Sequence, residues 1–153
     1  MGEAAVGWDD LDLEIMRLLN RDARQSYRDL ARQLKISTST VSNRIRRLEK
    51  EGIIKGYVPI IDQHKTGFDL PVVVGLQISK GKLLEVQQKI AEDPRVFGVY
   101  DVTGDWDSIV MARFRNTRDL DAFIKRVLAL PYVDRTYTQL VLNTVKEEKR
   151  ILL

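Results

Sequence analysis

The chain contains no cysteine and a single histidine, His64, among its 153 residues. Without cysteine it can form neither disulfide bonds nor thiolate metal sites, and one histidine cannot supply a cluster of nitrogen ligands. Zinc, haem and iron–sulfur functions are therefore excluded, and we expect no cofactor. No stretch approaches the ~18 consecutive apolar residues that a membrane span requires. The acidic segment Met1–Asp10 differs from a basic, apolar signal sequence, so we expect a cytoplasmic protein.

Charge is distributed unevenly, although the net charge is only +3. Between Leu11 and Ile60 there are 11 Lys and Arg against 6 Asp and Glu, whereas the rest of the chain has no basic excess. Such an excess is typical of a nucleic-acid-binding unit, but it also occurs on ordinary solvated helix faces. The composition, 44% hydrophobic and 31% charged, is that of a folded protein with one ordinary domain or two small ones.

Apolar residues at helical spacing indicate three helices in the basic third of the chain. They are Leu11, Ile15, Leu18 and Leu19 in the first helix, Leu30, Ala31 and Leu34 in the second, and Val41, Ile45 and Leu48 in the third. Asp9 or Asp10 is suited to cap the first helix, Ser26 with Asp29 to cap the second, and the hydroxyls of residues 37–40 to cap the third. This spacing predicts a helix-turn-helix.

The segment after the third helix has the features of a wing. Gly52 supplies a stop for the helix. Ile53–Ile61 is β-prone and predicts a hairpin, with Gly56 near its turn and Pro59 limiting pairing on the far arm. The first 61 residues are therefore interpreted as a winged helix-turn-helix.

The third helix places polar and basic side chains opposite its apolar stripe. Such a face fits the major groove, where cations contact phosphates or guanine edges and short polar groups contact bases or backbone. The predicted DNA-binding residues are Thr38, Ser39, Thr40, Ser42, Asn43, Arg44, Arg46, Arg47 and Lys50. Two alternatives stay open. Arg44 could pair with a carboxylate of its own domain, and Ser37 and Thr38 could serve only as caps.

The second half alternates strand and helix patterns in the order βαββαβ. The predicted strands are Val72–Ile78, Val96–Val102, Ile109–Phe114 and Val133–Val145. Apolar stripes over 83–90 and 120–128 indicate two helices, which stop before Pro94 and at Pro131. A weak internal sequence repeat supports two βαβ halves, because the pattern P-x-V-x-x-x-Y begins at Pro94 and again at Pro131. We predict an α+β protein with a winged helix-turn-helix at 1–61, a linker at 62–70 and a ferredoxin-like βαββαβ sandwich at 71–153.

The motifs of both halves resemble those of the Lrp/AsnC, or feast/famine, transcriptional regulators. The resemblance rests on Asp9-x-x-Asp12-x-x-Ile15, on Ile36-Ser37-x-x-x-Val41-x-x-Arg44-Ile45-x-x-Leu48-Glu49-x-x-Gly52-Ile53-Ile54, and on Gly104-Asp105-Trp106-Asp107. It implies a RAM-type second domain that forms a homodimer, often assembled into octamers. It also implies a small effector, typically an amino acid, held between subunits near the Gly-Asp-x-Asp loop.

This loop offers what an amino acid needs, since backbone N–H groups can bind its carboxylate and aspartates can bind its ammonium. The predicted effector-binding residues are Tyr100, Gly104, Asp105, Trp106, Asp107, Thr136 and Thr138. Three alternatives stay open. The loop could be a tight hairpin whose aspartates cap turns. Thr136 and Thr138 could be ordinary strand residues, and Asp101, Asp105 and Asp107 could hold magnesium or calcium.

We therefore expect a transcriptional regulator whose DNA binding is tuned by an effector, not an enzyme. No nucleophile with an adjacent base is visible. A two-fold dimer would present two recognition helices to double-stranded DNA, so the operator should be pseudo-palindromic, with half-sites ~10 bp or a multiple apart. The alternatives are a small enzyme or an amino-acid-binding regulatory protein, roles that ferredoxin-like domains also serve, and an architectural DNA-binding protein with low sequence preference.

Overall fold

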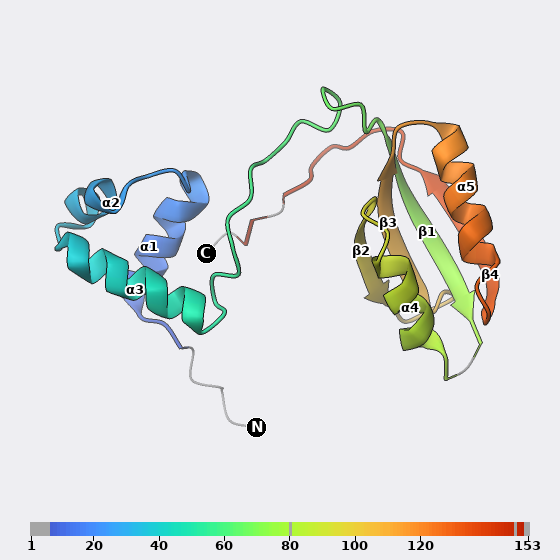
Figure 1. Cartoon of the computed structure of the whole chain (residues 1–153), viewed down its shortest axis with the longest axis horizontal. Coiled ribbons are helices and arrows are strands. Elements are labelled where there is room, and N and C mark those ends of the chain that lie inside the picture. The colour runs from blue at the N-terminus through green and yellow to red at the C-terminus, as the bar shows by residue number, and fades with distance from the viewer. Residues whose placement is uncertain (1–6, 80, 149, 152–153) are drawn as a thin grey trace. The chain divides into compact units, whose positions relative to one another are not determined.

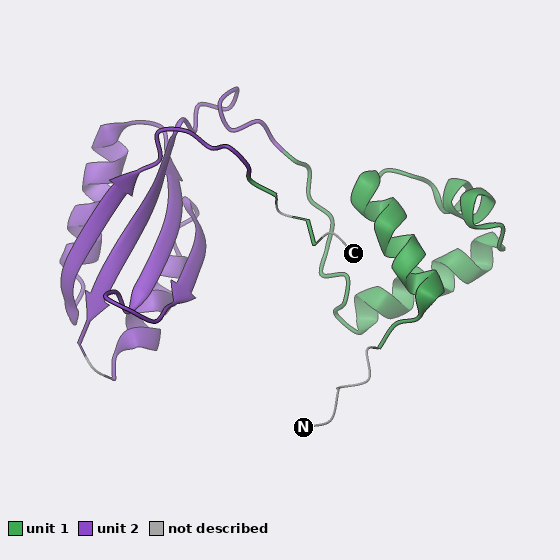
Figure 2. Cartoon of the chain, turned by 180° about the vertical axis from the view of Figure 1, so that it is seen from behind, with its two compact units in different colours: residues 1–60, 147–153 green, residues 61–146 purple. Residues whose placement is uncertain are grey.

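The computed structural model describes residues 7–79, 81–148 and 150–151, so most of the acidic N-terminal segment lies outside it. The chain divides into two compact units (Figure 1). One comprises residues 1–60 with 147–153, and the other comprises residues 61–146, as Figure 2 shows in green and purple. The predicted α+β class is confirmed, because three helices precede a four-stranded sheet with two helices.

The first unit contains α1 (Asp10–Arg21), α2 (Tyr27–Leu34) and α3 (Thr38–Lys50). Asp9 caps α1 in a capping box, because its side chain accepts from the Asp12 N–H at 3.0 Å while the Asp12 carboxylate accepts from the Asp9 N–H at 2.9 Å. Ser26 caps α2 by accepting from the Asp29 N–H at 3.1 Å. These local bonds satisfy backbone donors that a helix start otherwise leaves unbonded.

The apolar stripes of the three helices meet in one core. Its members include Ile15, Leu30, Val41 and Ile45, all with no exposed surface. After α3 the chain turns at Gly52, whose φ of 72° lies in the left-handed region that glycine adopts without strain. The predicted stop of the helix is thereby confirmed.

The hairpin expected at Ile53–Ile61 is wrong, because residues 55–62 have no regular secondary structure. Pro59 has no N–H to donate to a ladder, and Val58 and Ile60 are 84% and 80% exposed. A two-stranded hairpin without a packed face is only marginally stable in water. The segment is instead tied to α3 through one side chain, since the Tyr57 hydroxyl donates to Glu49 at 3.0 Å.

The second unit has the predicted βαββαβ order. Its elements are β1 (Leu70–Ile78), α4 (Leu83–Ala91), β2 (Val96–Asp101), β3 (Ser108–Phe114), α5 (Thr117–Leu128) and β4 (Val133–Leu140). The strands are antiparallel in the order β2-β3-β1-β4. Both helices cover one face of the sheet, and Figure 2 shows the other face uncovered within this unit.

The core of this unit lies between the sheet and its two helices. Along β1, Val72, Val74 and Leu76 point to the helices and are at most 1% exposed. They pack with Phe114 of β3 and Phe123 of α5, whose ring centroids are 5.2 Å apart. The period-two alternation of β1 thus separates a helix-facing side from an open side.

The last strand is shorter than expected, since β4 ends at Leu140 and not at Val145. Leu140 pairs with Val72, and the Val141 N–H donates to Pro71 O at 3.0 Å, where β1 itself begins. Residues 142–148 and 150–151, which the structure describes beyond this point, pair with no strand, and Val145 is 93% exposed. A β-prone sequence therefore continues past the sheet without pairing.

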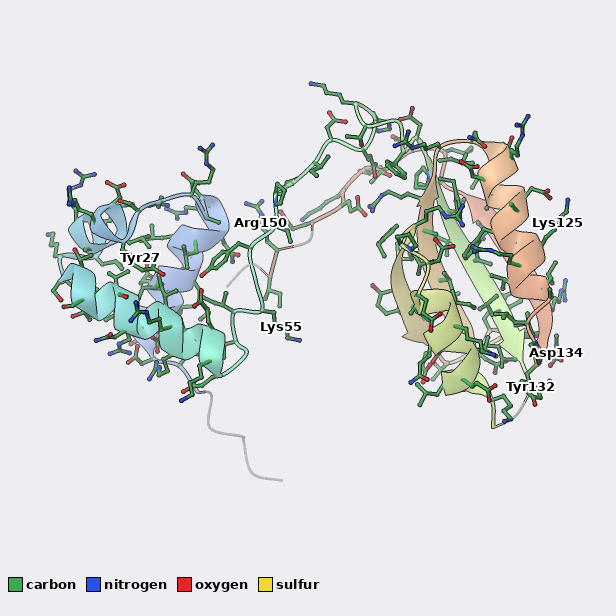
Figure 3. All side chains as sticks on the ribbon, viewed as in Figure 1. Tyr27, Lys55, Lys125, Tyr132, Asp134 and Arg150 are labelled. Atoms are coloured by element: carbon green, nitrogen blue, oxygen red, sulfur yellow. The ribbon has the colours of Figure 1, made fainter. Side chains whose placement is uncertain are left out.

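The start of β4 is tied to the end of β1. The Ser79 N–H donates to Tyr132 O at 2.9 Å, and the Ser79 hydroxyl donates to Asp134 at 2.8 Å. Tyr132 adopts a left-handed conformation, with φ 74°, as the chain turns into β4. Figure 3 shows Tyr132 and Asp134 together at this end of the sheet.

Candidate functional site

The outer face of α3 is polar and exposed. Asn43, Arg46 and Lys50 are exposed along it, and Thr38 and Ser39 are exposed in its first turn. The opposite face is buried in the helical core. A helix held by an apolar stripe, with cationic and amide groups outward, has the size and chemistry to enter a major groove.

The hydroxyl groups at the start of α3 form a local cap. Ser37 is the N-cap, and its Oγ accepts from the Thr40 N–H at 3.0 Å. The same oxygen lies 2.8 Å from the hydroxyls of Ser39 and Thr40. Thr38 is the first helical residue and not the cap. Thr40 and Ser42 are half-buried, so they reach solvent less than the first two residues of the helix.

Two arginines of α3 are directed to carboxylates of their own domain. Arg44 pairs with Asp9 and lies 3.3 Å from Asp12, and Arg47 pairs with Asp12. The hydrogen bond from Arg44 lowers the pKa of Asp9 from 3.8 to about 2, and the same bond raises the pKa of Arg44. The intradomain alternative for Arg44 is thus what the structure shows, and Arg47 shares it. Arg46 forms no ion pair with any residue that the structure describes.

In the second unit, Asp107 anchors the base of the loop between β2 and β3. Its N–H donates to Leu76 O at 2.9 Å, and its carboxylate accepts from the Ile78 N–H at 2.8 Å. The pairing of β1 with β4 is irregular at Ile78, so this carboxylate bonds an N–H at a break in the ladder. The predicted ligand-binding aspartate therefore already has a structural partner.

Gly104 and Asp105 form the tip of the loop. Gly104 has φ 116°, a conformation that favours glycine. Gln77 donates through Nε2 to Asp105 O at 3.1 Å, while the Asp105 side chain is exposed. That side chain has no ion-pair partner in the described part of the chain. The tip therefore presents an exposed carboxylate, which can accept hydrogen bonds from an ammonium group.

Trp106 lies on the open face of the sheet. Its ring stacks on Tyr137 of β4, with centroids 5.6 Å apart and an interplanar angle of 20°. Gly75 of β1 lies beneath it, where an added Cβ would be 2.7 Å from Trp106 Cδ2. Sequence reasoning missed both contacts. A glycine inside a strand was the available signal, because it often marks a close approach of another group.

The remaining predicted effector residues lie on different sides of the sheet. Tyr100 lies on the open face, where its ring folds back over Gly98. Thr136 and Thr138 are opposite Leu76 and Val74, which point to the helices, so both threonines lie on the helix side. Within one chain, the sheet separates these threonines from the indole on the other face.

Neither a metal site nor a membrane span is found in the described residues. No group of three or more potential metal ligands gathers there. Asp101 is bonded by Gln87 and Asp107 by a backbone N–H, which leaves the magnesium or calcium alternative without support. The helices of residues 7–79, 81–148 and 150–151 include none that is long and apolar enough to cross a bilayer.

Comparison with known sequences gives two family matches. Residues 9–55 match a model described as winged helix-turn-helix DNA-binding, and residues 71–151 match the Lrp/AsnC ligand binding domain. An uncharacterized HTH-type transcriptional regulator of Pyrococcus abyssi is 41% identical, covering 94% of this chain and 97% of the relative. The HTH-type transcriptional regulator Ptr1 of Methanocaldococcus jannaschii is 34% identical, again over 94% of this chain and 97% of the relative.

Solved structures share the architecture over nearly the whole chain. An AsnC family transcriptional regulator from Agrobacterium tumefaciens has a TM-score of 0.86 at 25% identity, covering 94% of this chain and 96% of that one. The regulator NMB0573 of Neisseria meningitidis, solved as an L-Met complex, has a TM-score of 0.85 at 21% identity, with coverage of 94% and 96%.

Proposed function

The chain belongs to the Lrp/AsnC family of transcriptional regulators, with a DNA-binding and a ligand-binding domain, and we propose that an amino acid bound at the second domain controls its DNA binding. The resemblance expected from the sequence is thus confirmed. We assign residues 1–61 to DNA binding, 62–70 to the linker and 71–153 to effector binding and oligomerisation. Its relatives are transcriptional regulators, and we infer a cytoplasmic, non-enzymatic role for this chain.

The exposed face of α3 is the observation that carries the DNA-binding part of the proposal. Arg46 and Lys50 suit phosphate oxygens or guanine edges, and Asn43 suits adenine. We propose these three residues and Ser39 as the principal contacts, because their side chains are exposed on one face. Arg44 and Arg47 would instead orient the helix through their carboxylate partners.

Selection of binding sites from a random duplex library tests this interface. A homodimer would present two copies of α3, so the selected sites should be pseudo-palindromic with half-sites ~10 bp or a multiple apart. Arg46→Ala should weaken binding of the selected site about tenfold or more, as loss of one base or phosphate contact does. The control is Arg118→Ala, an exposed arginine of α5. Equal affinity for random and selected DNA would favour the architectural alternative.

The loop tip supports the effector part of the proposal. The Asp105 carboxylate can accept from an ammonium, and the backbone near Gly104 can donate to a carboxylate. The L-Met complex of the Neisseria neighbour supports an amino acid as the first class to test. Calorimetric titration with each of the 20 amino acids should find at least one that binds. Asp105→Asn should abolish that binding, whereas Asp121→Asn on the exposed face of α5 should not.

Regulation requires that the effector bind one state of the protein more tightly than another. We propose that these states are different assemblies of a homodimer, up to an octamer, formed through residues 71–153. Light scattering with and without the amino acid found by calorimetry measures this shift directly. An unchanged mass together with unchanged operator affinity would overturn the regulatory role of that amino acid.

A further inference from the structure

Helix α4 buries one polar side chain, that of Gln87. It is 9% exposed and lies between Val86 and Ile90 on the apolar stripe, which are 2% and 3% exposed. A buried amide is unfavourable unless its donors and acceptors find partners. The partners of Gln87 therefore show what this side chain does in the fold.

Those partners lie at the two ends of the β2–β3 loop. Gln87 Nε2 donates to Ser108 Oγ at 3.0 Å and also to the carboxylate of Asp101. Ser108 is completely buried, and its hydroxyl donates onward to Tyr100 O at 3.0 Å. Asp101 and Ser108 face each other in the ladder as the last pair before the loop. The side-chain amide of Gln87 therefore bonds both residues at the base of the loop, Asp101 and Ser108, a pair that we call the neck.

We propose that Gln87 is a positioning residue for the effector loop, residues 102–107. It fixes the neck from the helix side of the sheet, and Trp106 is fixed on the open side by Tyr137 and Gly75. The loop is thereby linked to α4 as well as to the sheet. The functional meaning of this link rests on the proposed role of the loop in binding an amino acid, although Gln87 itself does not reach the loop tip.

Substitutions of Gln87 can distinguish a positioning role in hydrogen bonding from a role in core packing alone. Methionine has nearly the volume of glutamine and fills a core without donating a hydrogen bond. Gln87→Met therefore keeps the packing and removes the hydrogen bonds to Asp101 and Ser108. Glutamate keeps the shape but places a second carboxylate beside Asp101, where like charges repel. Gln88, the next residue of α4, is exposed, so Gln88→Met is the matched control.

Hydrogen–deuterium exchange on the full chain tests the proposal without any ligand. In Gln87→Met, exchange of residues 102–107 should rise about tenfold, the equivalent of one hydrogen bond, while exchange in β1 and β4 stays unchanged. Gln88→Met should match the wild type. Unchanged exchange in the loop would overturn the proposal that Gln87 positions it. Faster exchange spread evenly over the sheet would also overturn it, because it would indicate a general loss of stability.

A second measurement separates this inference from the proposed function. L-methionine is titrated calorimetrically into wild type and Gln87→Met, followed by the other amino acids. If wild type binds one of them, Gln87→Met should bind it about tenfold more weakly, and equal affinity would overturn positioning of the effector site. If wild type binds none, the amino-acid assignment fails, and the exchange experiment alone decides whether Gln87 positions the loop.

Discussion

The Arg47 guanidinium on α3 donates to the buried carboxylate of Asp12 on α1. Asp12 also accepts from the Asp9 N–H in the capping box of α1 and lies 3.3 Å from Arg44. One carboxylate thus joins the start of α1 to the second half of α3. The orientation of the helix that we assign to the DNA groove therefore depends on an ion pair inside the domain.

This arrangement predicts opposite phenotypes for two neighbouring arginines. Arg47→Ala should destabilise the first unit by about 3 kcal/mol, because it leaves Asp12 buried without its main partner. Arg46→Ala should leave the melting temperature unchanged and weaken DNA binding. Thermal denaturation and gel-shift titration of both variants measure the contrast. A loss of DNA affinity in Arg47→Ala with full stability would mean that Arg47 contacts DNA directly.

The Asp9 carboxylate should titrate well below the ordinary pKa of an aspartate. The hydrogen bond from Arg44 holds its pKa at about 2 in the folded protein, against an ordinary value of 3.8. Since the folded pKa is depressed, the stabilisation is complete above pH 3.8 and is lost as the pH falls towards 2. Carboxyl carbon NMR measures the midpoint directly. In Arg44→Ala the midpoint should return towards 3.8, and no change would exclude Arg44 as the cause.

Tyr57 should ionise later than an ordinary tyrosine. Partial burial, followed by its hydrogen bond to Glu49, raises its pKa from 10.0 to about 12. Because the folded pKa is raised, the stabilisation is present below pH 10 and is lost as the pH rises through 12. The difference in tyrosinate absorbance between wild type and Tyr57→Phe reports this one residue. Glu49→Gln should lower the midpoint, and a midpoint near 10 in wild type would contradict the contact.

Gly75→Ala should displace Trp106 from the open face of the sheet. The new methyl group would lie 2.7 Å from Trp106 Cδ2, closer than a Cβ approaches a ring, so the indole would have to shift from its place on Tyr137. We expect a loss of about 1–3 kcal/mol and a red-shifted tryptophan emission, measured with Trp8→Phe so that one indole remains. Gly7→Ala is the control, since its Cβ would meet Glu51 at 3.5 Å. Unchanged emission would show that Trp106 does not pack on Gly75.

Local patterns predicted most of the secondary structure, because each helix is stabilised by caps and stripes close in sequence. Ser26 and Ser37 cap their helices as expected, and Gly52 ends α3. The stripe from Leu120 predicted α5 but not its start, which is set by the N-cap Asn116, whose side chain accepts from the Asp119 N–H at 2.9 Å. That signal was also local and could have been read. The extra length given to β4 was not an error of this kind, because strand ends depend on where partner strands stop.

The sequence by itself determined the family, the order of elements and the polar face of α3, since these depend on residue spacing along one helix or strand. Only the tertiary structure decided which arginines of α3 remain available for DNA, because the partners of Arg44 and Arg47 lie more than 30 residues away, in the cap and first turn of α1. It likewise placed Trp106 and Thr138 on opposite sides of the sheet. Charge pairing and the choice of face are set by distances between elements, which no local pattern contains.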